Sequence, residues 1–293
     1  MSLIVSGLTD YAKAEGFQLI AAAVTKGRTA DYVNIVSGLK GAGLVPFMDS
    51  TVTLSAGGTC SFTNNGTSTF SEVEIGVKPT EYMEAVCIGA LEGKAMMYEV
   101  SGYDEIPYAE TFLGLKADQI SKALDTNYWL GSVAGGDAFN GFTVQGAAKM
   151  VTITGSTSSV YDAIDLAIDT AVAADSTFET SDSVAIFLNY AKFRTLQKEL
   201  VAKNYFHYNP ASIESNMEIL FPGTKIKVIA TEGLAGHNFL YLADAQHLHI
   251  GTNLASEAEG LNVYHDMITN NLYIRAAFYA GTGVSKAFFK KAC

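Results

Sequence analysis

The stretch Thr51–Ser71 carries no charged residue, and 15 of its 21 positions are Ser, Thr, Gly or Asn. Apolar residues still alternate with polar ones on both sides of its centre: Val52, Leu54 and Ala56 before it, and Val73, Ile75 and Val77 after it. Alternation with a period of two is typical of a β-strand with one buried face. An Asn-Gly pair between two such runs is typical of a two-residue hairpin turn. The sequence therefore predicts a long β-hairpin that turns at Asn64-Asn65-Gly66.

This hairpin has almost nothing to bury within itself. A two-stranded ribbon is only marginally stable in water, so we expect it to lie on a surface that another molecule supplies. The chain is 48% hydrophobic and 17% charged, which is enough for a large core, and a neighbouring copy of the same protein is the simplest such surface. The predicted contact residues are Leu54, Phe62, Asn65, Gly66, Phe70 and Glu72.

Composition excludes several classes of protein. The 293 residues suit one or two domains, and no apolar run reaches the ~18–20 residues of a membrane span. No basic leader precedes the apolar residues 19–24, so we expect no signal peptide. Three scattered cysteines form neither a disulfide framework nor a CxxC pair, which favours the reducing cytoplasm. The net charge of −11 is unsuited to gripping phosphates, although an acidic protein can still enclose nucleic acid.

The middle of the chain predicts two consecutive helices. Over residues 81–100, one stripe holds Tyr82, Val86, Ala90 and Met97. The next helix begins near Pro107, ends at Gly131 and, at 1.5 Å per residue, its roughly 20 residues span ~30 Å. Spacing of i, i+3 and i+4 predicts that its buried face consists of Phe112, Leu115, Ile120, Ala123, Leu124 and Tyr128.

Helices and strands mix in the second half of the chain, which gives an α+β fold class. Ser159 with Asp162 fits a capping box, and Asn189 is a second helix cap. Strands are expected at Val184–Leu188, Lys225–Ala230, Phe239–Asp244, His247–Gly251, Leu261–Asp266, Leu272–Ala280 and Val284–Phe289. By contrast, residues 1–45 read as an arm with short helical pieces rather than as a packed domain.

A search for catalytic chemistry finds no nucleophile elbow and no phosphate-binding loop. His247 and His249 share a strand face, but only Asp244 stands nearby as a third ligand, so half-buried strand histidines are favoured over a zinc site. Glu72 and Glu74 are more typical of a solvated face than of an acid–base pair. We therefore expect no enzyme, no cofactor and no metal; the alternative is an enzyme whose residues meet only in three dimensions.

The order of these parts resembles the major capsid protein of tailed bacteriophages, the Hong Kong 97-like fold. Asp118–Gly131 is similar to the end of the family's spine helix, and Val184–Phe193 to its axial-domain strand and following helix. The closing strands of the family resemble Phe221–Val228, Phe239–Ala243 and Tyr273–Gly281. The similarity follows nearly the whole chain in order, through patterns rather than invariant motifs.

The resemblance implies an N-terminal arm at 1–45, an extended loop at 46–80 and an axial domain at 151–261. A peripheral domain would combine 81–150 with 262–293. The implied function is self-assembly into pentamers and hexamers that close an icosahedral shell around double-stranded DNA. The protein would belong to the virion and be assembled in the host cytoplasm, and it would enclose the DNA without sequence-specific binding.

The resemblance also implies partners. Because the chain begins almost directly with the arm, we expect a separate scaffolding protein, besides a portal and decoration proteins. Some members weld subunits through a Lys–Asn bond on the extended loop; here that loop has no lysine before Lys78, so no such crosslink is expected. Two alternatives remain open. One is an encapsulin-type nanocompartment that encloses protein cargo, and the other is a surface adhesion protein with a Ser/Thr-rich hairpin.

Overall fold

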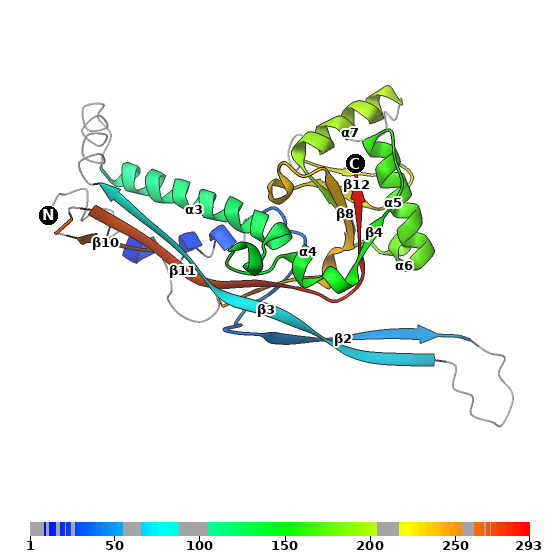
Figure 1. Ribbon diagram of the computed structural model, residues 1–293, viewed down its shortest axis with the longest axis horizontal. Coiled ribbons are helices and arrows are strands. Elements are labelled where there is room, and N and C mark those ends of the chain that lie inside the picture. The colour runs from blue at the N-terminus through cyan, green and yellow to red at the C-terminus, as the bar shows by residue number, and fades with distance from the viewer. Residues whose placement is uncertain are drawn as a thin grey trace.

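The computed structural model shows an elongated molecule, with a rounded domain at one end and a two-stranded hairpin that projects beyond it (Figure 1). It describes Thr9, helical turns within residues 12–15, 18–20 and 22–24, and the segments 27–54, 66–87, 105–203, 217–253, 261–266, 268–269 and 271–293. The side chains of residues 105–110 and 261 are excepted.

The first sheet forms the long body of the molecule. Its order is β1 (Asn34–Val36), β9 (Leu248–Thr252), β11 (Asn271–Val284), β3 (Gly66–Cys87) and β2 (Gly43–Val52), and β10 (Leu261–Asp266) also pairs with β11. Helix α3 (Glu105–Leu130) runs along this sheet (Figure 1). Leu113, Ala117, Ile120, Leu124 and Tyr128 of this helix are buried, and they recur every three or four positions because one stripe of the helix faces the sheet.

The second sheet forms the rounded domain. Its order is β4 (Met150–Ile153), β12 (Phe288–Ala292), β8 (Phe239–Asp244), β5 (Val184–Leu188), β7 (Lys227–Ala230) and β6 (Glu218–Leu220). The helices of this domain are α5 (Val160–Ala174), α6 (Thr177–Thr180) and α7 (Tyr190–Ala202). Helix α4 (Phe142–Gln145) and four short 3₁₀ turns complete the described elements: Val133–Gly135, Ala147–Lys149, Glu232–Leu234 and Ala245–His247.

Strand β5 separates two hydrophobic clusters. Ala185 and Phe187 belong to the larger cluster, whereas Val184, Ile186 and Leu188 belong to the cluster under α5 and α7. Successive side chains of a strand point to opposite faces, so one fully apolar strand serves both cores. In the larger cluster, the ring of Trp129 lies 4.9 Å from that of Phe187 between centroids and stacks on Tyr241 at 5.2 Å.

Several local predictions are confirmed. Strands β5, β8 and β10 have the expected boundaries, and the hairpin forms by antiparallel pairing of β2 with β3. Ser159 Oγ accepts a hydrogen bond from the Asp162 backbone N–H at 3.1 Å. Asn189 Oδ1 accepts one from the Lys192 backbone N–H at 2.7 Å. Both helix caps therefore act as the sequence predicts.

The helix expected over residues 81–100 is wrong where the structure describes it. Residues 81–87 belong to β3 and pair with β11, with Tyr82 opposite Ala276 and Val86 opposite Leu272. Residues 88–100 lie outside the described part. The expected buried face of α3 is also wrong at Leu115 and Ala123, which are exposed, because the stripe that meets the sheet runs through Leu113 and Ala117 instead.

Two further expectations are corrected. The arm has short helical pieces, but its side chains are packed: Ile20, Val24 and Val33 are buried in the larger cluster, since the arm lies against α3 and the first sheet. The two-residue turn is also wrong, because Gly66 pairs with Val52 and is the first residue of β3. Asn64 and Asn65 lie outside the described residues.

Candidate assembly surface

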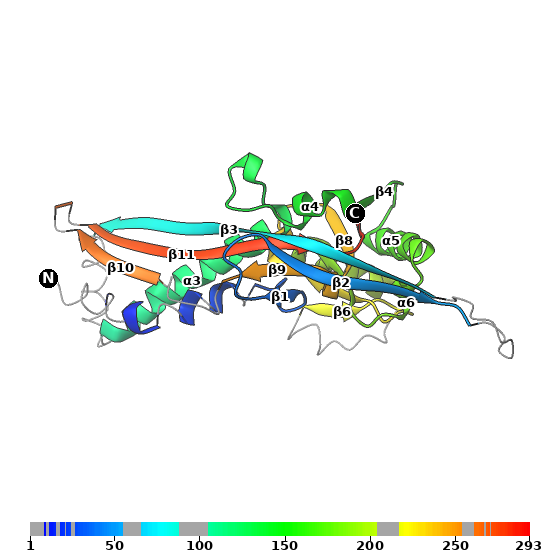
Figure 2. The same cartoon turned by 90° about the horizontal axis from the view of Figure 1, so that it is seen from below.

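The hairpin is an extension of the body sheet. Strand β3 pairs with β11 from Cys87 to Gly76 and then, from Ile75 to Gly66, with β2 alone among the described strands. Figure 2 shows β2 and β3 leaving the body together. One continuous strand of 22 residues therefore anchors the projecting part in the core.

One face of the hairpin points away from the rest of the molecule and carries apolar side chains. We call it the outer hairpin face, and it consists of Leu44, Met48, Val52, Phe70, Glu72 and Glu74, all exposed. Met48 and Phe70 lie directly opposite each other across the two strands, and they are 60% and 79% exposed. Exposed apolar patches on soluble proteins mark interaction sites, so this face is a candidate docking surface.

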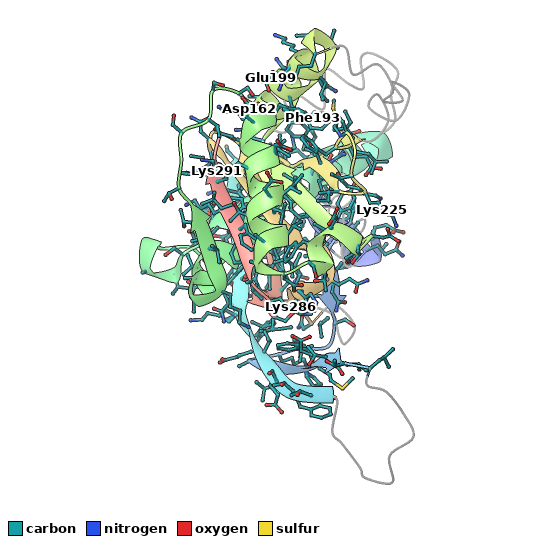
Figure 3. The ribbon with its side chains drawn as sticks, turned by 90° about the vertical axis from the view of Figure 1, so that its right-hand side faces the viewer. Asp162, Phe193, Glu199, Lys225, Lys286 and Lys291 are labelled. Carbon is teal, nitrogen blue, oxygen red and sulfur yellow. The ribbon has the colours of Figure 1, made fainter. Side chains whose placement is uncertain are left out.

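The opposite face of the hairpin overhangs the rounded domain. A cleft of about 680 Å³ separates the two, lined on the hairpin by Thr67, Thr69 and Ser71 and on the domain by Ala174, Phe178 and Phe289. Asp49 and Lys286 approach to 3.8 Å across it, and Figure 3 shows Lys286 at the end of the domain nearest the hairpin. An exposed pair of this length stabilises little, so the hairpin is held mainly by its own strand pairing.

The structure places the predicted contact residues as follows. Phe70 and Glu72 belong to the outer hairpin face, and Leu54 is exposed just beyond the end of β2. Gly66 is a paired strand residue, while Phe62 and Asn65 lie outside the described residues. Whether these residues contact a second copy stays a prediction.

Sequence reasoning missed Leu44, Met48 and Val52 as members of this face. Their signal in the sequence is weak, because residues 44–48 form a continuous apolar run and Ser50 stands between Met48 and Val52, so apolar and polar residues do not alternate there. Pro46 also argues against a strand, because proline lacks the N–H that a central strand needs. Strand β2 tolerates the proline as it lies at the edge of the described sheet.

A polar cluster lies where the hairpin meets the body. Ser285 Oγ is 2.8 Å from His247 Nδ1 and 3.1 Å from His249 Nε2, and Lys149 Nζ donates to the carbonyl oxygens of Val284 and Ser285 at 2.7 and 3.0 Å. Burial lowers the pKa of both histidines and of Lys149. Near neutral pH the imidazoles are therefore neutral, and their contacts with Ser285 join the start of β9 to the end of β11.

This cluster brings a serine, a histidine and an aspartate together, but their arrangement is structural and not that of a catalytic triad. Asp244 lies 3.8 Å from His247 Nε2, beyond hydrogen-bond length, and Ser285 is only 4% exposed and donates its hydroxyl to the His247 carbonyl at 3.1 Å. Across the described segments, no three His, Cys, Asp or Glu side chains lie together in a way that could hold a metal ion. Over the same residues, no helix combines the length and apolar character needed to cross a membrane.

Comparison with known proteins identifies the fold. No protein-family model and no curated protein matches the sequence. Among solved structures, the satellite phage P4 procapsid including its size determination (Sid) protein aligns with a TM-score of 0.62 and 10% identity, over 94% of this chain and 90% of that one. The capsid of Myoviridae phage XM1 aligns with a TM-score of 0.57 and 14% identity, over 92% of both chains. A virus-like particle from Pyrococcus furiosus aligns with a TM-score of 0.50 and 10% identity, over 93% and 96%. This chain therefore has the Hong Kong 97-like capsid fold.

Proposed function

We propose that this protein is a major capsid protein, a structural rather than catalytic component of a virion. Copies assemble in the host cytoplasm into pentamers and hexamers, which close an icosahedral shell around double-stranded DNA. The observation that carries the proposal is the outer hairpin face, because a chain with a capsid fold extends an anchored ribbon whose apolar residues have no cover within the described molecule.

Leaving these apolar side chains in water is unfavourable. Burying a Met or Phe side chain stabilises by about 1.5–3 kcal/mol relative to leaving it in water, and stable interfaces bury about 1,600 Å². A subunit that already buries a large core gains nothing from exposing Met48 and Phe70 as a monomer. We propose that the outer hairpin face, with Leu54, Phe62, Asn65 and Gly66 beside it, covers an adjacent copy.

The parts of the chain then take distinct roles. Residues 1–45 form the arm and 46–80 the extended loop; the axial domain is 151–261, and the peripheral domain combines 81–150 with 262–293. The second hydrophobic cluster supports the axial domain, because all of its buried members but Phe289 lie at residues 153–242, whereas the larger cluster draws residues from both domains. A separate scaffolding protein, a portal and decoration proteins complete the proposed assembly.

A second candidate encloses protein instead of DNA. The similarity to a virus-like particle from Pyrococcus furiosus favours an encapsulin-type nanocompartment as that alternative. For the DNA container, the net charge of −11 provides a lining that repels phosphates, so the genome slides rather than binds. Nucleic-acid and protein analysis of purified particles distinguishes the two, and tight DNA retention by emptied shells at low salt contradicts the repelling lining.

Light scattering with negative-stain microscopy on the purified chain, alone and with the proposed scaffolding protein, tests assembly. We expect megadalton closed particles or ring-shaped capsomers. A variant that replaces residues 48–70 with Asn-Gly keeps the Phe47–Ser71 strand pair and closes it with a hairpin turn. This variant should fold, as measured by circular dichroism, but assemble poorly. A full-length chain that stays a 31.2 kDa monomer under all these conditions overturns the proposal.

A further inference from the structure

Helix α5 presents an acidic face. Its 15 residues contain no lysine or arginine, and Asp162, Asp165 and Asp169 follow one another at i, i+3 and i+7, which places them on one side. Asp165 and Asp169 are exposed. Within the part of the chain that the structure describes, neither forms an ion pair, whereas Asp162 pairs with Lys203 at 3.3 Å. We call these three residues the α5 acidic face.

Helix α7 presents the opposite charge. Arg194 and Lys198 are exposed one turn apart, and these two residues are the α7 basic face. The single acid of α7, Glu199, is turned toward α5, where its carboxylate accepts from the backbone N–H groups of Val160 and Tyr161 at 3.1 and 2.7 Å. Arg194 and Lys198 have no ion pair among the described residues, so the positive charge of this face is uncompensated there.

The two faces match in spacing. Asp165 and Asp169 are four residues apart, as are Arg194 and Lys198, and each pair therefore repeats at about 6 Å along its helix. Like charges at i, i+4 destabilise the helix that carries them. Two such repulsive pairs of opposite sign on one domain are relieved together if the helices of two copies lie side by side.

The arrangement of the helices suits such a contact. Helix α7 lies across the top of the rounded domain and α5 runs down its right-hand side (Figure 1). Within one chain, Lys203, which follows the last residue of α7, pairs with Asp162 of α5, and its Nζ lies 3.7 Å from the centre of the Tyr161 ring (Asp162 and Glu199 in Figure 3). Among the described residues, no ion pair joins Asp165 or Asp169 to Arg194 or Lys198, so a second copy is needed to join these charges.

We propose that the α5 acidic face of one copy binds the α7 basic face of the next copy around a ring. This inference rests on the proposed function. The contact is heterologous: each copy gives its acidic face to one neighbour and its basic face to the other, and such contacts close into rings when the rotation between copies closes. Charge complementarity of this kind sets partner choice and register.

Charge reversal tests the contact. One variant carries Asp165→Lys with Asp169→Lys, a second carries Arg194→Glu with Lys198→Glu, and a third combines all four changes. All four side chains are exposed, so circular dichroism and thermal unfolding should show a native fold. Each two-site variant should weaken ring formation about tenfold or more per contact, whereas the four-site variant should assemble like the wild type.

Mixing the two defective variants gives the sharpest result. One variant has two basic faces and the other two acidic faces, so each repels itself and attracts the other. An equimolar mixture should form rings in which the variants alternate, and alternation permits only even-membered rings: hexamers without pentamers. Raising NaCl from about 0.15 M to about 1 M, which shortens the Debye length from about 8 to about 3 Å, should dissolve these mixed rings.

The outcomes separate this inference from the proposed function. If wild-type subunits assemble and the two-site variants assemble equally well at low salt, the charged faces are not the contact, and the inference fails while the shell function stands. If the variants fold and fail alone, but neither the four-site variant nor the mixture recovers, the inference also fails. A wild-type chain that never assembles overturns both.

Discussion

The Asp125 carboxylate accepts a hydrogen bond from Thr231 Oγ1 at 2.6 Å, joining α3 to the turn that follows β7. The same oxygen, Oδ2, accepts from the Gly233 backbone N–H at 2.7 Å, and Oδ1 accepts from the Thr29 backbone N–H at 3.1 Å. Asp125 is 2% exposed. One buried carboxylate thus ties the arm, the long helix and the second sheet together with charge-assisted hydrogen bonds.

Asp125→Ala should lower the free energy of unfolding by about 2–4 kcal/mol, because it removes three buried hydrogen bonds and leaves the Thr29 backbone N–H without its acceptor. Asp118→Ala is the matched control: Asp118 lies on the same helix but is exposed, and its loss should cost less than about 0.5 kcal/mol. Urea unfolding of the two variants measures the difference. Equal stabilities would show that the network does not hold the arm to the body.

Glu199 makes a comparable contribution at the start of α5. Its carboxylate supplements the Ser159 cap by accepting from two N–H groups of the first turn, where a negative charge also favours the helix dipole. Glu199→Ala should therefore cost about 1–2 kcal/mol. Glu199→Gln keeps one acceptor oxygen and should lose about half as much. Thermal unfolding ranks the two, and a glutamine variant as unstable as the alanine variant would contradict this account.

The sequence predicts elements whose signals are local. Strand β5 is five apolar residues between Ser183 and the helix cap Asn189, so both of its ends are marked. The helix predicted over residues 81–87 is wrong because Tyr82 and Val86 share a face both in a helix and in a strand. Pairing with β11, which is remote in sequence, decides in favour of the strand.

On the candidate assembly surface, too, some residues can be predicted from local patterns and others cannot. The alternation of β3 predicts Phe70 and Glu72, whereas Pro46 argues against a strand at Met48. The network around Asp125 was beyond prediction, because the Thr29 and Thr231 hydroxyls that meet there at 3.1 Å are 202 positions apart. No pattern within a helix or strand indicates such a meeting.

The two histidines at the base of the hairpin predict a pH dependence of stability. Burial lowers the pKa of His247 and of His249 below the ordinary 6.5, so the unfolded chain binds protons that the folded one does not. Stability then rises with pH in this range and is lost as pH falls below about 6.5. Between pH 7.5 and 5.5, above the usual carboxyl range, the free energy of unfolding should fall by up to about 1.4 kcal/mol per pH unit for each histidine.

Substitution identifies the groups responsible. His249→Gln keeps a polar side chain beside Ser285 and should remove about half of this slope, since one of two contributing imidazoles is gone. His237→Gln is the control, because His237 is exposed, and it should leave the slope unchanged. Urea unfolding at each pH measures both. A slope unaffected by His249→Gln would assign the dependence to other groups.

The outer hairpin face makes the most direct prediction about assembly. Met48→Ser with Phe70→Ser should leave subunit stability within about 0.5 kcal/mol of the wild type, because both side chains are exposed in the subunit. Assembly should weaken by at least about tenfold, since each lost burial is worth about 1.5–3 kcal/mol. Ser50→Ala with Ser68→Ala is the control: these residues pair across the neighbouring position of the same ribbon, and they offer a contact only a weak exposed hydrogen bond. Light scattering over a concentration series measures both variants. If the Met48 and Phe70 variant assembles as readily as the control, the apolar pair is not what holds neighbouring copies together.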